Sequence, residues 1–344
     1  MRTLRIAVDA MGGDLGPEEV VRGVLRAANE RVGAVDFCIV GDEGTIRLEL
    51  DSRKTVPPNV TVRHASQVIQ MSDKPREAYR KKPDASVVVS ARLVKEGEAD
   101  AFISIGNTGA AMASAVLLLR PMRGIDRPAI ATPLPSLRNT VVLLDAGANV
   151  DCVPHQLLEF AVMGQVYARQ VLGKPNPTVA LLSNGEEETK GNELTKEAHL
   201  LLKEQITPFY GNIEGMDVFR GKADVVVCDG FAGNILLKTG EGVAEMVLNM
   251  VRTELTRHRW MKLFLLPLRK GIRNLRNRID YREFGGAPLL GVNGICIIGH
   301  GRSDARAIVN AVAVAESAVR NDLVGEMEKA ICESEDRFGR WSKE

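Results

Sequence analysis

Short apolar runs rich in β-branched residues recur along the chain, and polar residues or glycines end them. The runs cover residues 4–9, 36–41, 60–64, 101–106, 140–147, 178–184, 223–230 and 294–299. Between most runs, apolar positions follow the spacing of an amphipathic helix. These helical segments cover residues 18–31, 85–96, 109–120, 155–172, 194–204 and 305–321. Strands that alternate with helices predict an α/β fold, with a mostly parallel sheet covered by helices on both faces.

The chain carries no segment that looks like a flexible linker. The proline-rich residues 133–135 and 174–177 are typical of turns, and no stretch rich in glycine and serine separates two halves. We therefore predict a single α/β unit over residues 1–344, with residues 241–282 forming a helical hairpin.

Composition excludes several classes of protein. Hydrophobic residues make up 45% of the chain and charged residues 26%, as in folded globular proteins. A net charge of +1 and an aromatic content of 4% argue against a general nucleic-acid-binding protein. The five cysteines include no CxxC pair, so neither a zinc site nor a thioredoxin-type site is indicated. The apolar residues 4–9 are too short for a signal peptide, and no apolar run approaches the roughly 18 residues of a membrane span.

Two loops that follow predicted strands resemble anion-binding loops, because ligands of α/β sheets bind beyond the carboxyl ends of the strands. Gly12 and Gly13 lie between the first strand and a helix. The sequence Gly106-Asn107-Thr108-Gly109 joins another strand to a helix whose backbone N–H groups are suited to phosphate. A tight turn with a threonine cap is the alternative for the second loop. Neither GxGxxG nor GxxxxGK occurs in the chain.

Three further strand ends carry asparagines and glycines, at residues 145–149, 183–191 and 228–234. Each one alone is compatible with an ordinary Asx-type turn. If all lie at one edge of the sheet, their asparagine amides, exposed backbone N–H groups and two lysines suit a phosphate and a developing oxyanion. His300 follows the last strand, where it is either a structural residue or a general acid.

Taken in order, these motifs resemble the PlsX family of phosphate acyltransferases over nearly the whole chain, from about residue 5 to residue 321. The motifs that carry the resemblance are Val8-Asp9-Ala10-Met11-Gly12-Gly13-Asp14, Gly106-Asn107-Thr108-Gly109-Ala110, Asp145-Ala146-Gly147-Ala148-Asn149, Asn184-Gly185-Glu186-Glu187, Asp229-Gly230-Phe231-Ala232-Gly233-Asn234 and Gly299-His300-Gly301.

The resemblance implies that a fatty acyl group passes from acyl carrier protein to inorganic phosphate. The acyl phosphate would then feed a membrane glycerol-phosphate acyltransferase in phospholipid synthesis. It also implies a three-layer αβα sandwich similar to phosphate acetyltransferases and isopropylmalate dehydrogenases. The expected protein is a cytoplasmic homodimer attached to the inner face of the cell membrane, without a metal or redox cofactor.

Attack of phosphate on a thioester needs a held phosphate and fixed donors for the oxyanion, but no covalent acyl-enzyme. On this basis and on the resemblance, we expect two sets of site residues. The expected catalytic residues are Asn107, Thr108, Asn149, Asn184, Lys190, Asp229 and Asn234. The expected substrate- and phosphate-binding residues are Gly12, Gly13, Gly106, Gly109, Asp145, Gly185, Lys238 and His300.

Two basic regions suggest macromolecular contacts. Residues 71–82 hold five lysines and arginines, and this region is either a solvated loop or a contact for phosphate or the acidic carrier protein. The residues we assign to the carrier contact are Arg76, Arg80, Lys81 and Lys82.

The second region, residues 252–282, has ten cationic against two acidic side chains, a net charge of +8. An apolar tip lies at its centre and predicts an anchor on anionic lipid, formed by Trp260, Leu263, Phe264, Leu265 and Leu266. A dimer contact and a plain packed helix pair are the alternatives for this hairpin.

Three other functions are weighed against the acyl-carrier reaction. A soluble phosphate acetyltransferase-like enzyme using acyl-CoA has no evident need for a cationic apolar hairpin. A decarboxylating dehydrogenase needs metal-ligating aspartates and a nicotinamide site, and the sequence has neither pattern. A non-enzymatic scaffold at the membrane surface would show no phosphate-dependent loss of thioester.

Overall fold

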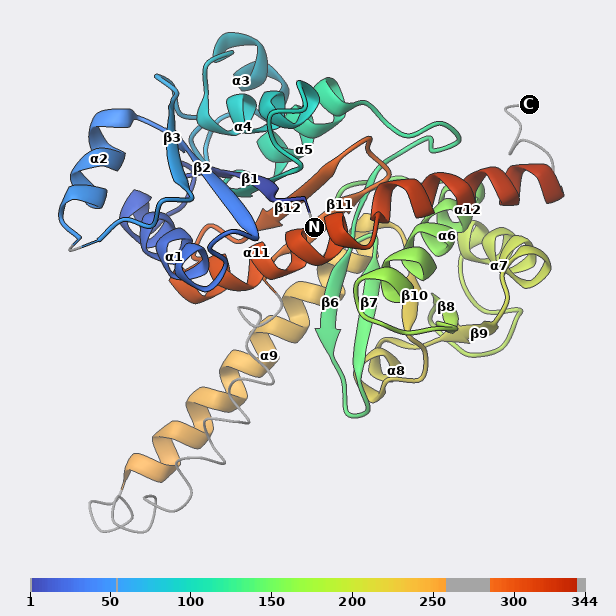
Figure 1. The fold of residues 1–344 in the computed structure, drawn as a ribbon. Helices are drawn as coiled ribbons and strands as arrows, with labels where there is room; N and C mark the ends of the chain where they lie inside the picture. Colours follow the sequence, from blue (N-terminus) through green and yellow to red (C-terminus); the bar gives the residue numbers. More distant parts are fainter. Residues whose placement is uncertain (1, 54, 258–284, 339–344) are drawn as a thin grey trace.

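The computed structural model describes residues 2–53, 55–257 and 285–338 (Figure 1). Its strands are β1 (Leu4–Asp9), β2 (Val35–Gly41), β3 (Val60–His64), β4 (Ala101–Ile105), β5 (Ala129–Ile130), β6 (Thr132–Pro135), β7 (Thr140–Leu144), β8 (Val179–Leu182), β9 (Phe209–Ile213), β10 (Val225–Val227), β11 (Ala287–Leu290) and β12 (Ile295–Gly299). Its helices are α1 (Gly16–Glu30), α2 (Glu43–Asp51), α3 (Pro75–Lys81), α4 (Ser86–Lys95), α5 (Thr108–Leu119), α6 (Pro154–Gln170), α7 (Glu193–Gln205), α8 (Gly215–Arg220), α9 (Gly230–Arg257), α11 (Ala305–Arg320) and α12 (Leu323–Phe338).

The strands form two sheets. A seven-stranded sheet has the order β3-β2-β1-β4-β12-β11-β5, and a five-stranded sheet has the order β6-β7-β10-β8-β9. All pairings are parallel except those of β11 with β12 and β5, and that of β6 with β7. The prediction of a mostly parallel α/β fold is therefore confirmed. The strand ends at residues 145–149, 183–191 and 228–234 follow β7, β8 and β10, which are adjacent parallel strands of the five-stranded sheet, so they meet at one sheet edge as expected. The loops at Gly12 and Gly106 follow β1 and β4 and belong to the seven-stranded sheet.

Successive side chains of a strand point to opposite faces of the sheet, and in the seven-stranded sheet apolar side chains on both faces pack against helices. In β1, Ile6 and Val8 pack into the cluster that holds α1 and α11, whereas Ala7 packs into the cluster that holds α4 and α5. Figure 1 shows these two helix pairs on opposite sides of the sheet. The first cluster continues into the face of the five-stranded sheet that α6 covers, so one apolar core joins the two sheets.

The prediction that residues 133–135 form a turn was wrong. They belong to β6, which pairs antiparallel with β7. Because β6 is an edge strand, one of its sides pairs with no other strand, and prolines, which lack a backbone N–H, are tolerated there.

Helix α9 begins at Gly230, well before the predicted start of the hairpin at residue 241, and runs to Arg257. It projects from the body of the molecule (Figure 1). Gly233 lies within the helix, where an added Cβ would overlap the carbonyl of Asp145, so close packing on β7 requires glycine there. In the described ranges, no helix has the length and apolar character needed to cross a bilayer.

Candidate functional site

Asp145, at the end of β7, organises the loop that follows it. Its fully buried carboxylate accepts hydrogen bonds from the backbone N–H groups of Ile130 (3.0 Å), Gly147 (3.1 Å), Ala148 (3.0 Å) and Asn149 (2.6 Å). It also accepts one from the side-chain amide of Asn149, at 3.0 Å. Burial raises the pKa of Asp145, and the backbone hydrogen bonds oppose that shift. This carboxylate therefore holds together β5 and the loop after β7.

Asn149 and Asp229 also act within the protein. The buried amide of Asn149 donates to the carbonyl of Pro128 at 2.9 Å, in addition to Asp145. Asp229 accepts from the backbone N–H of Ala232 at 2.8 Å and so caps the start of α9. These contacts use the donors of the Asn149 amide and one acceptor of Asp229.

The glycine loops of the seven-stranded sheet pack against each other. An added Cβ on Gly12 would lie 2.7 Å from the carbonyl oxygen of Ile105, and one on Gly106 would overlap the backbone of Gly12. Beneath them lies Asp9, whose carboxylate accepts from the Ser104 hydroxyl at 2.7 Å and from Met11 N–H at 3.1 Å. Burial raises the pKa of Asp9 despite these bonds. Asp9 therefore supports this pair of loops, and the sequence analysis did not single it out.

Asn107 joins the glycine loop to the basic segment. Its side-chain oxygen caps α5 by accepting from Ala110 N–H at 3.0 Å. Its amide donates to the carbonyls of Gln70 (3.1 Å) and Asp73 (3.2 Å). An added Cβ on Gly109 would overlap Pro75, the first residue of α3. The residues predicted to contact the carrier protein are therefore next to the Gly106–Gly109 loop.

Those predicted contact residues differ in their availability. Arg76, Arg80 and Lys81 are exposed, and Lys81 pairs with Glu77 at 3.3 Å. Lys82 is half-buried and donates to Asp73 and to the carbonyl of Val68. Lys82 therefore stabilises the conformation of residues 68–82, whereas the side chains of Arg76, Arg80 and Lys81 face solvent.

The loop at residues 183–192 holds Asn184, Gly185 and Lys190. Asn184 accepts from Gly191 N–H at 2.8 Å, which closes the loop on itself. An added Cβ on Gly185 would lie 2.7 Å from Cγ of Lys190, so glycine makes room for that lysine. Lys190 is exposed. The loop thus presents a cation to solvent from a closed turn.

Three consecutive glutamates brace this loop from outside. Glu186 pairs with Lys222, which also contacts the buried Asp217 at 3.0 Å. The backbone carbonyl of Glu187 accepts from the amide of Asn212 at 3.0 Å. Glu188 pairs with Lys203 at 2.6 Å. The acidic run therefore tethers the loop rather than serving the site directly.

A buried His199–Asn212 pair adds to the contacts that hold the 183–192 loop in place. Nδ1 of His199 lies 2.8 Å from Oδ1 of Asn212, and both residues are buried. Because the Asn212 amide donates to Glu187, its oxygen must accept from His199, so Nδ1 carries a proton. Sequence analysis missed both residues, since each lies inside an ordinary helix or strand pattern.

We expect Asn212→Ala to lower the free energy of unfolding by about 1–3 kcal/mol, because it leaves the buried His199 N–H and the Glu187 carbonyl without partners. Urea denaturation measures the change. Asn249→Ala, at an exposed position of α9, is the control and should lie within about 0.5 kcal/mol of the wild type. Equal stability of the Asn212 variant and the control would show that the hydrogen bonds of the Asn212 side chain do not stabilise the protein.

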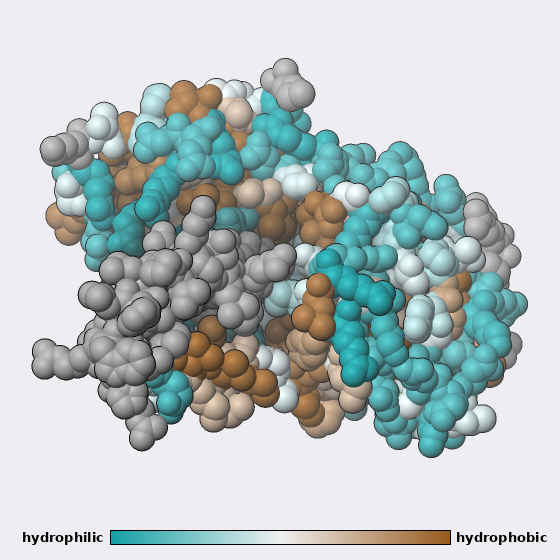
Figure 2. Space-filling model, turned by 90° about the horizontal axis from the view of Figure 1, so that it is seen from below, coloured by the Kyte–Doolittle hydropathy of each residue, from teal (hydrophilic) through white to brown (hydrophobic). Residues whose placement is uncertain are grey.

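A groove of about 1350 Å³ runs beside α9, between the β6–β7 hairpin and the ends of β11 and β12. Most of its lining is apolar, and includes Ile130, Pro133, Leu134, Leu137, Ala146, Phe219, Leu236, Leu237, Val243, Ala244, Ala287 and Ile298. Figure 2 shows apolar residues gathered over the middle of this face, beside the hydrophilic surface of the five-stranded half. The volume exceeds the roughly 300–1,000 Å³ of common small-molecule sites.

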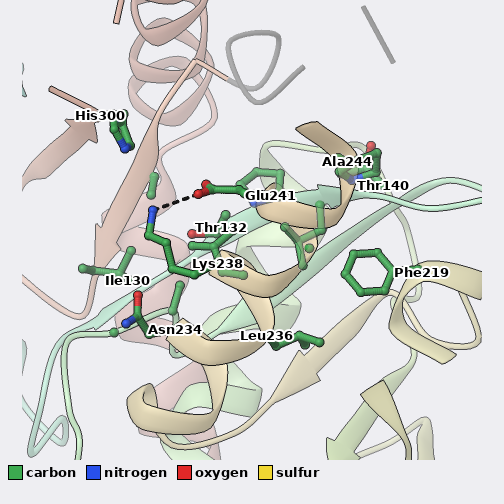
Figure 3. A pocket seen from close by; sticks show the side chains of 18 of the residues that line it. Ile130, Thr132, Thr140, Phe219, Asn234, Leu236, Lys238, Glu241, Ala244 and His300 are labelled. Carbon is green, nitrogen blue, oxygen red and sulfur yellow. Dashed lines mark hydrogen bonds and ion pairs between the residues drawn. The ribbon is translucent and has the colours of Figure 1, made fainter. Parts of the chain in front are cut away.

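Polar side chains gather at one part of the groove. Thr108, Asn234, Lys238 and His300 line it, and they come from α5, α9 and the end of β12. Figure 3 shows Asn234, Lys238 and His300 on the same side of the view, with Lys238 joined to Glu241 at 2.8 Å. Four residues predicted from the sequence thus share one groove.

The other predicted site residues lie elsewhere in the structure. Asn107 is adjacent to Thr108 but faces the 70–73 turn, and Asn149 and Asp229 are engaged as described above. Asn184 and Lys190 belong to the loop after β8, which pairs with β10 in the five-stranded sheet. The predicted membrane-anchor residues Trp260, Leu263, Phe264, Leu265 and Leu266 lie outside the described residues.

The electrostatic setting of His300 favours its neutral form. Burial is the first cause that lowers the pKa of His300, and the nearby Lys238 ammonium lowers it further, while Glu241 acts in the opposite direction. Backbone N–H of Arg302 donates to Nδ1 of His300 at 3.2 Å. With Nδ1 accepting, the neutral ring carries its proton on Nε2.

Two substitutions should move this pKa in opposite directions. Lys238→Met removes a repelling cation and should raise the pKa of His300, whereas Glu241→Gln removes an attracting carboxylate and should lower it. An NMR titration of the imidazole C–H signals measures both shifts. Shifts of the same sign in the two variants would contradict the arrangement.

The chain is similar in sequence and in fold to several known proteins. The sequence profile of a family described as "Fatty acid synthesis protein" matches residues 4–326. The chain is 50% identical over 322 residues to "Phosphate acyltransferase" from Desulforudis audaxviator, an alignment that covers 94% of each chain. Among solved structures, it is similar to a phosphotransacetylase from Streptococcus pyogenes, with a TM-score of 0.62, 18% identity and coverage of 92% and 94%. It is also similar to a branched-chain phosphotransacylase from Enterococcus faecalis, with a TM-score of 0.54, 15% identity and coverage of 92% and 99%.

Proposed function

We propose, because this chain belongs to the PlsX family of phosphate acyltransferases, that it transfers the acyl group of an acyl carrier protein thioester to inorganic phosphate. The products are acyl phosphate and the free carrier thiol. Acyl transfer to phosphate in fatty acid and phospholipid synthesis is the activity of the family; the carrier-bound donor and the acyl phosphate product are the proposal.

The observation that carries the proposal is the groove beside α9. Its long apolar lining suits a hydrocarbon chain, and its polar part holds an ammonium, an imidazole, an amide and a hydroxyl, from Lys238, His300, Asn234 and Thr108. An acyl thioester has the same division, with an apolar chain attached to one polar reacting group. A long chain in the groove would bring its carbonyl to this polar part.

The chemistry follows from that placement. A phosphate oxygen attacks the thioester carbonyl carbon, the carbonyl oxygen becomes an oxyanion, and the C–S bond breaks with its electron pair leaving on sulfur. Donors such as the Asn234 amide, the Lys238 ammonium and the Nε2–H of neutral His300 are suited to the oxyanion and the phosphate. Because a thiolate leaves readily, the reaction does not depend on a strong general acid.

This chain offers a basic surface that is suited to contact with the carrier protein. Asn107 holds the 70–73 turn and α3 beside Thr108, so the exposed cations Arg76, Arg80 and Lys81 lie next to a residue of the groove. Cations at the rim attract an acidic carrier and guide its approach.

The wider setting is also part of the proposal. We infer a homodimer that attaches peripherally to anionic lipid on the cytoplasmic face of the membrane, through the basic segment that follows α9. There its labile acyl phosphate would reach a membrane glycerol-phosphate acyltransferase. Cosedimentation with anionic vesicles, with Leu263→Glu/Phe264→Glu as the comparison, tests this attachment, and equal pelleting of folded dimers of both would contradict it.

Donor choice is tested by supplying palmitoyl carrier protein and palmitoyl-CoA in separate reactions, with and without phosphate, and following thiol release. The proposal expects phosphate-dependent release that is faster from the carrier protein. Faster release from palmitoyl-CoA would instead favour a soluble phosphate acetyltransferase-like enzyme. Absence of phosphate-dependent release from either donor would favour a non-enzymatic scaffold.

A further inference from the structure

We propose that Phe219 narrows the groove and sets the acyl-chain length beyond which added methylenes gain little. The inference rests on the proposed function for the identity of the ligand, a saturated acyl chain. Phe219 is in α8, and its side chain lines the groove.

Phe219 is fixed at two points, through its backbone to the β6–β7 turn and through its ring to α9. The backbone carbonyl of Phe219 accepts from Leu137 N–H at 2.9 Å, which fixes the end of α8 against the β6–β7 turn. On the other side, an added Cβ on Gly240 would lie 2.8 Å from Cζ of the ring and 3.2 Å from Cε1. The ring therefore packs directly on the backbone of α9, at a position where glycine leaves room for it.

The ring lies away from the reacting part of the groove. Figure 3 shows Phe219 on the opposite side of the view from His300, Lys238 and Asn234. Along α9, Asn234 precedes Gly240 by about 9 Å, since a helix rises roughly 1.5 Å per residue. A chain whose carbonyl lies near Asn234 thus has a defined length of groove before it meets the ring.

Beyond Phe219 the lining changes character. Arg220 follows it directly in the chain, pairs with Asp217 at 3.2 Å and keeps 57% of its side chain exposed. Arg138, in the β6–β7 turn, also lines the groove, and its Cβ lies 3.3 Å from the position of a Cβ added to Gly221, the residue after Arg220. A methyl terminus pushed past the ring would meet these guanidinium groups beside the smaller apolar side chains of Val243 and Ala244, so further methylenes would gain less apolar contact.

The chain-length dependence of binding reports on this wall independently of catalysis. Displacement of the fluorescent probe parinaric acid by hexanoate, octanoate, decanoate, laurate, myristate and palmitate gives relative affinities in the wild-type protein. Each methylene that enters the groove should strengthen binding about fourfold. The gain per methylene should fall once the chain reaches Phe219.

Two substitutions should move that limit in opposite directions. Phe219→Ala opens the end, so the gain should continue to longer acids, whereas Phe219→Trp fills more of the groove and should end the gain earlier. Tyr210→Ala truncates a half-exposed aromatic ring of β9 outside the groove, and its profile should match the wild type. Thermal unfolding checks that each variant is folded. If the alanine variant unfolds, Phe219→Trp still tests whether residue 219 changes the chain-length limit.

The same variants are then assayed with carrier-bound acyl groups and phosphate. In Phe219→Ala, the ratio of kcat/KM for the first chain beyond the limit to that for the last chain within it should rise on the order of tenfold. Unchanged profiles in both folded Phe219 variants, or no displacement of parinaric acid from the wild type, would overturn the inference. Shifted binding profiles in a protein that forms no acyl phosphate would uphold the inference and contradict the proposed function.

Discussion

Lys190→Ala is expected to lower kcat/KM for phosphate-dependent acyl transfer on the order of 10²-fold, the usual cost of losing one preorganised group that stabilises transition-state charge. Lys190 is an exposed cation on a loop that is closed by Asn184 and braced by Glu186 and Glu188. Its loop follows β8, which pairs with β10, and β10 leads into the helix α9 that carries Asn234 and Lys238, so we expect this ammonium to add to their stabilisation of the attacking phosphate. Steady-state thiol release at varied phosphate measures the loss.

Two controls distinguish the expected loss of activity from a loss of stability and from a general effect of removing a surface charge. Because the lysine is exposed, Lys190→Ala should change the free energy of unfolding by no more than about 0.5 kcal/mol. Lys196→Ala removes an exposed lysine from α7 outside the loop and should keep the wild-type rate. A folded Lys190→Ala protein with full activity would show that this loop does not hold the phosphate.

Asp145→Ala should lower the free energy of unfolding by about 3–5 kcal/mol, the largest stability loss we expect in this chain. The substitution removes the common acceptor of five hydrogen bonds in the protein interior, including those of Ile130, Ala148 and Asn149. Each buried N–H left without a partner costs free energy, and the buried carboxyl also leaves a gap. Urea denaturation gives the difference.

The exposed Asp151, near the same loop, offers a matched comparison. Asp151→Ala should change stability by no more than about 0.5 kcal/mol. If both alanine variants unfold at the same urea concentration, the carboxylate of Asp145 is not the centre of the loop network.

Sequence periodicity predicted the strands that carry the two sheets, because long buried β-branched runs have few alternatives. Short strands such as β5, with two residues, carry too little pattern to be found. The prolines of β6 indicated a turn, and only its place at the edge of a sheet explains how they are tolerated. The division into two sheets depends on long-range pairing that local pattern does not encode.

Glycines were the least reliable guide to local structure. The sequence from Asp229 to Asn234 has the composition of a loop, yet it forms the start of α9. Gly233 and Gly240 stand in that helix because the Asp145 carbonyl and the Phe219 ring approach its backbone closely. Their partners come from distant parts of the chain, so the reason for these glycines becomes visible only in the folded structure.

The site was predicted in part for a similar reason. Strand-end motifs identified Thr108, Asn234, Lys238 and His300, which the structure brings to one groove. The apolar lining of the groove had no signal in the sequence, because its residues come from many elements and each also fits an ordinary core pattern. The roles of the individual catalytic residues stay predictions.

The central claim is that phosphate itself attacks the thioester. The most direct measurement is incubation of the protein with palmitoyl carrier protein and phosphate labelled with oxygen-18 in every position, followed by mass spectrometry. We expect palmitoyl phosphate that carries all of the labelled oxygens, formed together with free carrier thiol. Release of unlabelled palmitate by water, without labelled acyl phosphate, would contradict the claim.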